Sequence, residues 1–231
     1  MARRRANDYD EKRRGILSRS AALFAVHGYT GTSITMIAEA CGVSKALMYH
    51  YYSSKDAVLF DLLSDHLQHL VAVVEAASQS PSDGKETLFA ISAALLEAYR
   101  GADAEHQVQI ASLKLLPAAQ QEILKEMERK LVALVSNALL AAVPAIAKKR
   151  HLLKPLTMSF FGMLNWHYLW FREGKGLTRD KYARMVTALI LAGADEAMAA
   201  ADEPVAVPGI ERPAVKKKTE KPRVALAGRA V

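Results

Sequence analysis

The sequence is nearly devoid of cysteine and has no long uninterrupted apolar run. Its 231 residues include one cysteine, Cys41, so no disulfide framework can form within the chain and a reducing compartment is expected. The first six residues hold three arginines and lack the apolar stretch of a secretory signal. The most apolar run, residues 131–147, is shorter than the ~20 residues that span a membrane and is interrupted by Asn137 and Pro144. We therefore expect a cytoplasmic protein in which this run forms a buried helix.

Motifs of catalysis and of cofactor binding are also missing. The sequence contains no glycine-rich phosphate loop, no nucleophile elbow and no paired set of metal ligands. His66 and His69 lie one helical turn apart, and they can share a metal ion only if a third ligand converges on them. Placed between apolar residues of a long helix, they are expected to lie on its surface. We expect no enzyme activity, no metal and no cofactor, and we expect Cys41 to pack between helices.

Positive charge is concentrated in two terminal segments. The formal net charge is +7, with nine Lys/Arg against five Asp/Glu in residues 1–60 and seven against two in residues 204–231. The long middle segment carries fifteen against seventeen. Basic ends around a nearly neutral body indicate contact with a polyanion at the termini. For the C-terminal segment a second explanation stays open, namely a basic tail that only increases solubility.

Apolar residues recur with helical spacing along most of the chain, and no stretch alternates long enough to indicate a strand. The first helix is expected to start at a cap on Asn7 or Asp8 and to end at Gly28. Ser53 and Asp56 offer a capping box for the fourth helix. The expected helices after the first cover about residues 33–40, 44–51, 55–77, 85–100, 104–115, 117–142, 152–172 and 179–200.

These patterns predict an all-α fold with two folded parts. Residues 9–60 form an N-terminal three-helix domain, and residues 61–200 form a larger C-terminal helical domain. Residues 1–8 are expected to be a flexible basic arm. Residues 201–231, in which prolines, lysines and small residues dominate without periodicity, are expected to be a disordered basic tail.

Residues 33–52 fit a helix-turn-helix motif. Ala38 is small at the point where two helices must cross closely, and Gly42 permits the sharp turn between them. Ser44 caps a short helix that leaves both polar and apolar side chains projecting outward, and such a helix fits the major groove of DNA. The apolar wedge that the two helices share is expected to consist of Ile37, Val43 and Met48.

The stretch from Ile16 to about Leu63 resembles the DNA-binding domain of the TetR family of bacterial regulators. The family pattern is matched without a gap in spacing. The matching residues are Ile16, Leu17, Leu23, Phe24, Gly28, Tyr29, Thr35, Ile37, Ala38, Gly42, Val43, Ser44, Tyr49, Tyr51, Tyr52, Ser54, Lys55 and Asp56. Small departures, such as Ala46 where glycine is common, leave the fold intact but change the apolar surface offered to DNA.

The resemblance implies which side chains contact DNA. It makes Thr35, Tyr49 and Lys55 phosphate contacts. The residues that it turns toward the bases are Lys45, Leu47 and His50, and Ser33, Ser44 and Ala46 complete the predicted face. Lysine can donate to guanine, and leucine can pack on a thymine methyl group. The arginines Arg3, Arg4 and Arg5 are expected to enter the adjacent minor groove.

The C-terminal domain is expected to bind a ligand and to form a homodimer. A twofold dimer doubles the contacts with a palindromic DNA site. Apolar residues three or four apart lie on the last two predicted helices, and the resemblance implies that these helices pair with those of a second subunit. The residues concerned are Leu156, Phe160, Phe161, Leu164, Tyr168, Tyr182, Met185, Val186, Leu189 and Ile190. The resemblance also implies a small-molecule site whose occupation spreads the two DNA-reading helices apart.

Residues 160–177 resemble, more loosely, a C-terminal signature of TetR-type repressors of steroid, aromatic-acid and fatty-acid catabolism, which answer to acyl-CoA thioesters. Trp166 and Trp170 are then candidates to wall an apolar slot, and Asn165 to hydrogen-bond the thioester or the pantetheine. Arg172, together with Lys148, Lys149 and Arg150, provides candidate phosphate partners. An aromatic stripe at helical spacing can equally be ordinary core.

Together these features predict a DNA-binding transcriptional repressor that is released from its operator by a small effector. Repression rather than activation is implied by the family and not by any residue. Two alternatives remain. One is an architectural protein that binds DNA with little sequence preference, which leaves the large aromatic-rich body unexplained. The other is a regulator that senses an apolar compound without coenzyme A.

Overall fold

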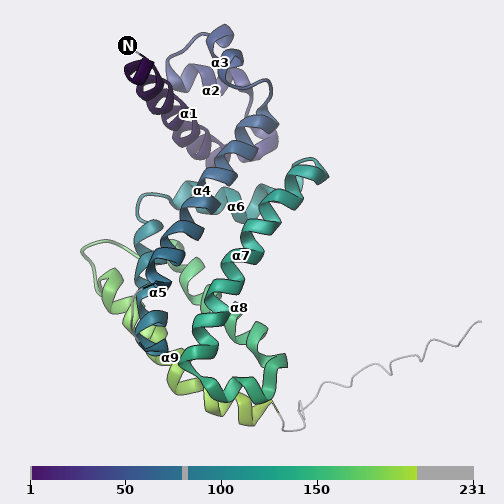
Figure 1. Cartoon of the computed structure of the whole chain (residues 1–231). Coiled ribbons are helices and arrows are strands. Elements are labelled where there is room, and N and C mark those ends of the chain that lie inside the picture. Colours follow the sequence, from purple (N-terminus) through teal and green to yellow (C-terminus); the bar gives the residue numbers. More distant parts are fainter. Residues whose placement is uncertain (1, 80–82, 202–231) are drawn as a thin grey trace, which may run out of the picture.

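The computed structural model describes residues 2–79 and 83–201, with side chains from Tyr9 onward. Within these ranges the chain is all helical, as the sequence predicts, and it contains no strand beyond one isolated bridge between Arg172 and Lys175 (Figure 1). The α-helices are α1 Ala2–Gly31, α2 Ile34–Cys41, α3 Lys45–Tyr51, α4 Lys55–Ser78, α5 Gly84–Ala98, α6 Asp103–Ser112, α7 Ala118–Ala142, α8 Leu153–Asn165 and α9 Arg179–Ala200. The 3₁₀ segments are η1 Leu113–Leu115, η2 Pro144–Leu152 and η3 His167–Leu169.

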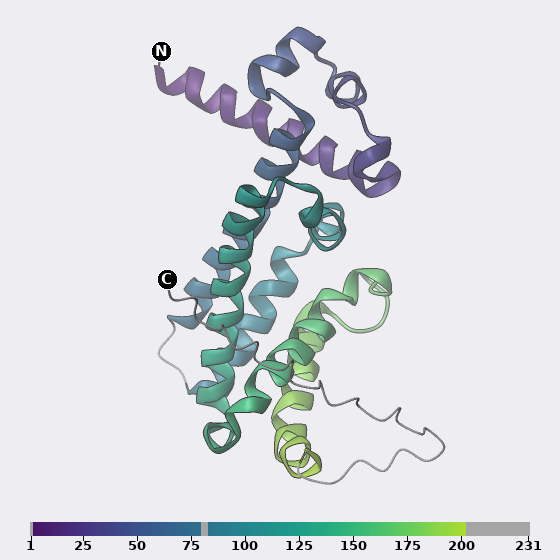
Figure 2. The same cartoon turned by 90° about the vertical axis from the view of Figure 1, so that its right-hand side faces the viewer.

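The molecule has a head and a body joined by one long helix. The head consists of α1, α2, α3 and the first half of α4, and the body consists of the rest of α4 with α5 to α9. Figure 1 shows α4 running from the head at the top into the body below. Inside the body α4 packs against α5 and α7, and the view turned by 90° shows α7 running alongside α4 (Figure 2).

The helices of the head begin at serine caps. The side-chain oxygens of Ser33, Ser44 and Ser54 accept hydrogen bonds from the third backbone N–H beyond each of them, at 3.1 Å in all three cases. The capping box predicted at Ser53 is therefore wrong by one residue, because Ser54 takes the capping position. Gly42 ends α2 in the left-handed conformation, with φ of 66°. Glycine adopts this conformation without steric cost, so the turn forms as predicted.

The flexible arm predicted at residues 1–8 is not observed in the described backbone, because α1 is helical from Ala2. Alanine and arginine are both strong helix formers, so the start of the chain extends the helix that follows it. The other end agrees better with the sequence. Gly28, with φ of 70° and ψ of 166°, breaks the helical conformation where an end was expected.

Two apolar cores lie along α4. The core of the body gathers Leu70, Val71 and Val74 of α4 with residues of α5, α7, α8 and α9. The core of the head is built from α1 to α4, but it also includes residues from the body. These are Val108 of α6, Leu113 and Leu116 of or beside η1, and Leu124 of α7. The domain boundary predicted at residue 60 therefore falls inside a continuous helix, and α6 closes the head core from below.

Helix α4 is long and apolar enough to cross a membrane by length and composition, and among the described residues it is the one helix that meets this test. Of its most apolar window, 56% is buried inside the protein, as is usual for the core helix of a folded domain. The run at residues 131–147, judged most apolar from the sequence, contributes the last part of α7 and the start of η2.

The helix predicted at residues 152–172 is interrupted. Helix α8 ends at Asn165, and η3 and a turn containing Gly174 and Gly176 follow it. The backbone carbonyls that would continue the helix are taken by side chains. Tyr182 Oη donates to the carbonyl of Met163 at 2.7 Å, and His106 Nε2 donates to that of Asn165 at 3.1 Å. These tertiary hydrogen bonds replace the i to i+4 bonds of a longer helix.

Candidate DNA-binding face and effector cavity

Helix α3 presents the predicted DNA-reading side chains on an exposed face. Met48 is fully buried and fixes the helix to the head core. Lys45, Ala46 and His50 are exposed, and Leu47 and Tyr49 keep 39% and 47% of their surface open to solvent. Exposing large apolar side chains to water is unfavourable, and such side chains are suited to contact with bases and sugars. The structure thus places the five α3 residues predicted to contact DNA, three at the bases and two beside them, on the exposed part of one short helix.

The two predicted contacts at the start of α2 lie beside this face. Ser33 is exposed and already caps α2, and Thr35 is half-buried in its first turn. Helix N-termini offer unpaired N–H groups that suit phosphate oxygens. The placement therefore agrees with a phosphate-contacting role for this segment.

Lys55, predicted to contact a phosphate, is held inside the head. Its Nζ donates to the backbone carbonyls of Tyr29 and Thr32 at 2.7 and 2.8 Å, and lies 4.1 Å from the centroid of the Tyr29 ring. Asp56, the next residue, accepts a hydrogen bond from the Tyr29 hydroxyl. Lys55 thus ties the end of α1 to the start of α4, and contact with DNA would have to share its ammonium group.

A polar lock that the sequence did not reveal joins α1 and the end of α3 to α4. Asp61 Oδ2 accepts from Arg13 Nε at 2.8 Å and from the Tyr52 hydroxyl at 2.6 Å. Hydrogen bonding to Asp61 raises the pKa of Arg13, and burial followed by the bond to Asp61 raises the pKa of Tyr52. Arg13 and Asp61 are 48 residues apart, so no local pattern marks this lock. It fixes the angle at which α3 is presented.

The remaining head predictions have mixed outcomes. Cys41 packs against the head core, and burial raises the pKa of its thiol, which agrees with packing rather than reactivity. The side chains of Arg3, Arg4 and Arg5 lie outside the described residues, as does the basic tail beyond residue 201.

The histidines of α4 differ from each other. His69 is exposed as expected, but His66 is 6% exposed, so its predicted surface position is wrong. Burial, and then repulsion from His106, lowers the pKa of His66 to about 3. No group of three metal-ligating side chains occurs in the described part of the chain.

A cavity of about 230 Å³ lies in the body. Its wall is mostly apolar, with polar groups supplied by α5, α6, α7 and the end of α8. Tyr99 Oη donates to Asn165 Oδ1 at 2.8 Å, and the rings of Tyr99 and His106 lie 4.4 Å apart between centroids. The lining residues are Leu70, Tyr99, His106, Gln109, Glu128, Leu131, Val132, Met158, Phe161 and Asn165.

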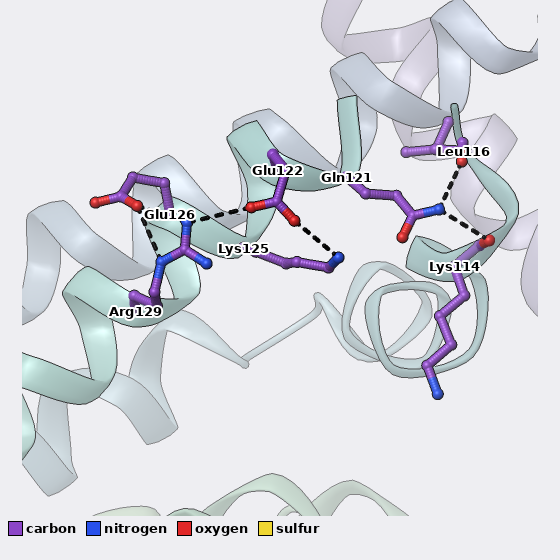
Figure 3. Close-up of polar contacts among 7 residues, drawn as sticks. All are labelled: Lys114, Leu116, Gln121, Glu122, Lys125, Glu126 and Arg129. Atoms are coloured by element: carbon purple, nitrogen blue, oxygen red, sulfur yellow. Dashed lines mark hydrogen bonds and ion pairs between the residues drawn. The ribbon is translucent and has the colours of Figure 1, made fainter. Parts of the chain in front are cut away.

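A larger groove of about 540 Å³ adjoins this cavity and shares Glu128, Val132 and Met158 with it. It lies over α7, η2 and α8, and its apolar floor is edged by four cations, Lys125, Arg129, Arg150 and Lys154. Lys125 and Arg129 already pair with Glu122 and Glu126 along the exposed side of α7 (Figure 3). Arg150 and Lys154 are exposed and make no ion pair among the described residues.

Of the residues predicted to bind an effector, Asn165 lines the cavity. Trp166 and Trp170 do not line it or the groove, and they are 50% and 53% exposed. The prediction that both tryptophans lie one turn apart on a single α-helix is wrong. Helix α8 ends at Asn165, and the tryptophans flank the 3₁₀ segment η3. The remaining three lie elsewhere: Arg172 Nη1 donates to the backbone carbonyl of Phe171, Lys149 Nζ to that of Met198, and Lys148 is exposed on η2.

The predicted dimer stripes divide into a buried and an exposed set. Phe160, Leu164, Val186 and other members of the stripes belong to the body core and are unavailable to a partner. Two members of the stripes on α9 and three large apolar residues of or beside η3 stay open to solvent. These are Trp166, Leu169, Trp170, Met185 and Leu189, each at least 40% exposed.

The head and body together define a helix-turn-helix regulator, and comparison with known proteins places it in a family. A family model described as bacterial regulatory proteins, tetR family, matches residues 16–62. A second, described as tetracyclin repressor-like, C-terminal domain, matches residues 81–194. The chain belongs to the TetR family and is a DNA-binding transcriptional regulator.

Similar proteins of this family match over most of their length. A crystal structure of a TetR-family transcriptional regulator from Bordetella parapertussis 12822 is 37% identical, with a TM-score of 0.74, over 80% of this chain and 96% of that one. The HTH-type transcriptional repressor KstR2 of Rhodococcus jostii (strain RHA1) is 26% identical over 79% of this chain and 90% of its own length. AibR, solved in complex with isovaleryl coenzyme A and operator DNA, is 25% identical with a TM-score of 0.65, over 77% and 97%.

Proposed function

We propose that this protein is a cytoplasmic, homodimeric repressor that leaves a palindromic operator when an acyl-CoA thioester binds its body. The observation that carries the DNA half is the exposed face of α3, anchored by buried Met48 and held in place by the Asp61 lock. In this arrangement Lys45, Leu47 and His50 face the bases, and Ser33, Thr35 and Tyr49 lie on the flanking phosphates.

The dimer is supported by the exposed apolar residues of η3 and α9. Trp166, Leu169 and Trp170 are half open to solvent, and Trp170 contacts Tyr182 of α9, the helix that also leaves Met185 and Leu189 exposed. A twofold interface would cover them and would set two α3 helices at the spacing of a palindrome. The substitution Leu189→Glu should convert the dimer to a monomer in sedimentation velocity, whereas Leu177→Glu, at another exposed leucine outside this set, should not.

The effector class is supported by the pairing of an apolar cavity with a cationic groove. An acyl chain fits the cavity, and the phosphates of coenzyme A fit the groove edged by Arg150 and Lys154. AibR shows that a similar protein of this family takes an acyl-CoA. Bound between α6 and α7, such a ligand would favour the spacing of heads that cannot hold the operator.

The test is fluorescence anisotropy of a DNA fragment from upstream of the protein's own gene, titrated with a panel of acyl-CoA thioesters. We expect a specific complex that one or more thioesters loosen, and the double variant Arg150→Ala/Lys154→Ala should require about tenfold more thioester. Lys148→Ala, which removes a charge outside the groove, is the matched control.

Other outcomes of the same titration identify the alternatives. Release by the free acid but not by its thioester would overturn the acyl-CoA assignment and leave a repressor that senses an apolar compound. Footprinting that shows sequence-tolerant protection, with no single palindrome, would replace the repressor with an architectural DNA-binding protein.

A further inference from the structure

Two hydrogen-bond acceptors in the wall of the cavity are buried without a partner. His106 Nδ1 and Gln109 Oε1 both have no hydrogen bond among the described residues, and both side chains come from the same face of α6, three positions apart. A buried acceptor that loses water without gaining a donor costs free energy, so native proteins rarely leave one unpaired. Here two occur on side chains that line one cavity.

The hydrogen bonds around His106 make its Nδ1 an acceptor. Nε2 lies 3.1 Å from the backbone carbonyl of Asn165, which can only accept, so Nε2 carries the hydrogen. The side chain is 2% exposed, and burial lowers the pKa of the ring, which is therefore neutral. A neutral imidazole with its hydrogen on Nε2 has a free lone pair on Nδ1.

The amide of Gln109 is oriented in a similar way. Its Nε2 donates to Glu128 Oε1 at 3.3 Å, and a carboxylate can only accept, so the amide oxygen is the atom left over. Nor does the rest of the wall supply a hydroxyl for these acceptors. Tyr99 carries the one hydroxyl in the lining, and it already donates to Asn165 Oδ1.

We infer that the part of the effector that enters this cavity carries a hydroxyl or N–H group, which donates to His106 Nδ1 and Gln109 Oε1. A plain hydrocarbon chain would leave both acceptors unpaired, and a ligand with two donor hydrogens would satisfy both. This inference rests on the proposed function, because it assumes that the cavity is the effector site. It narrows the effector from any acyl thioester to one with a donor on its acyl portion.

The test compares matched probes by isothermal titration calorimetry. The first set is butyryl-CoA and its analogues with a hydroxyl at carbon 2, 3 or 4. At least one hydroxylated probe should bind about tenfold more tightly than butyryl-CoA, the factor expected for one hydrogen bond to a buried acceptor. The variants His106→Phe and Gln109→Leu should each reduce this preference while still binding butyryl-CoA.

Gln107→Leu, on the same helix but outside the cavity, is the matched control and should keep the preference. Operator binding and thermal unfolding of Gln107→Leu and Gln109→Leu should stay near those of the unaltered protein, whereas His106→Phe also loses the hydrogen bond to the Asn165 carbonyl and should unfold at a lower temperature. If His106→Phe does not fold, the probe preference of Gln109→Leu alone tests the inference. Equal affinity for the hydroxylated and plain probes, or a preference that the folded cavity variants retain, overturns the inference.

A second set of probes separates this inference from the proposed effector class. It pairs 4-ethylphenol, which carries a donor, with 4-ethylanisole, in which a methyl group replaces the donor hydrogen. Tighter binding of the phenol, lost in Gln109→Leu, supports the inference even if no thioester binds and the acyl-CoA assignment fails. Failure of both sets to show a donor preference overturns it even if plain thioesters release the operator.

Discussion

The polar side chains that hold α3 in place and those that line the body cavity differ in their hydrogen bonding. In the head, Arg13, Tyr52 and Lys55 each hydrogen-bond to partners on other elements. The unpaired atoms Ser64 Oγ and His66 Nε2 lie further along α4, where it leaves the head. In the body, His106 and Gln109 keep unpaired acceptors beside a cavity. The polar contacts that position α3 are therefore complete in the described structure, whereas two acceptors on side chains that line the cavity have no partner among the described residues.

The two regions are joined by elements that belong to both. Helix α4 carries the head on its first half and one wall of the body core on its second. Helix α6 lines the cavity with His106 and Gln109, and it buries Val108 in the head core. Helix α6 therefore connects the cavity wall directly to the head core.

The largest expected effect is loss of the head lock. Asp61→Ala leaves the guanidinium of Arg13 and the hydroxyl of Tyr52 without their shared acceptor, so we expect the free energy of unfolding to fall by about 2–3 kcal/mol. Urea denaturation followed by circular dichroism measures it. Asp65→Ala is the control, because Asp65 is half exposed and bonds only Arg13, at 3.2 Å. Equal losses of unfolding free energy in both variants would show that the hydrogen bonds to Asp61 do not hold the head together as described.

The buried His66 predicts a dependence of stability on pH. Its pKa is lowered to about 3 in the folded state, so between that value and about 6.5 the unfolded chain binds a proton that the folded chain does not. Stability should therefore be complete above pH 6.5 and fall as the pH falls, by about 2 kcal/mol at pH 5. His66→Leu should reduce the slope of the profile measured by urea denaturation and leave the part that buried His106 contributes, and His69→Leu, one turn away and exposed, should leave the profile unchanged.

The DNA face should be sensitive to single side chains without a cost in stability. Lys45→Ala and Tyr49→Phe should each weaken operator binding, the lysine variant by about tenfold, because one base or phosphate contact is lost. Anisotropy at fixed salt measures the affinity, and Lys85→Ala, which removes the same charge far out on the body, is the control. If neither reading variant changes the affinity, the assignment of α3 is wrong.

The smallest effect concerns Cys41. Because burial raises the pKa of its thiol, we expect Ellman's reagent to modify it more slowly in the folded protein than in urea at the same pH. Cys41→Ala should cost less than about 1 kcal/mol, since the side chain is only partly buried. Fast modification of the folded protein would contradict the packing of Cys41 against the head core.

Local signals predicted much of the head. Ser33 and Ser44 cap helices and Gly42 turns the chain through bonds to residues three or four positions away, so their roles follow from neighbouring residues. The same local reasoning failed at Ser53, because two adjacent serines compete for one capping position and only the packing of α4 chooses Ser54. It also missed Asp61, whose partner Arg13 comes from a distant helix.

The residues around the proposed effector cavity were predicted less well, because long-range hydrogen bonds end α8. An aromatic stripe from Phe160 to Trp170 predicts a continuous helix with both tryptophans on one face. In the folded chain, Tyr182 and His106 take the carbonyls of Met163 and Asn165, which turns the tryptophans outward and leaves Asn165 at the cavity. Tyr99, His106 and Gln109, which form its polar wall, carry no local signal.

The sequence by itself determined the helical class, the helix-turn-helix and the exposed face of α3, because caps, turns and apolar periodicity act over a few residues. Tertiary structure alone decided where α8 ends, which histidine is buried and which acceptors remain unpaired. Those features depend on contacts between side chains of α4, α6 and α8. These helices are far apart in the sequence, so a local sequence pattern does not reveal the contacts.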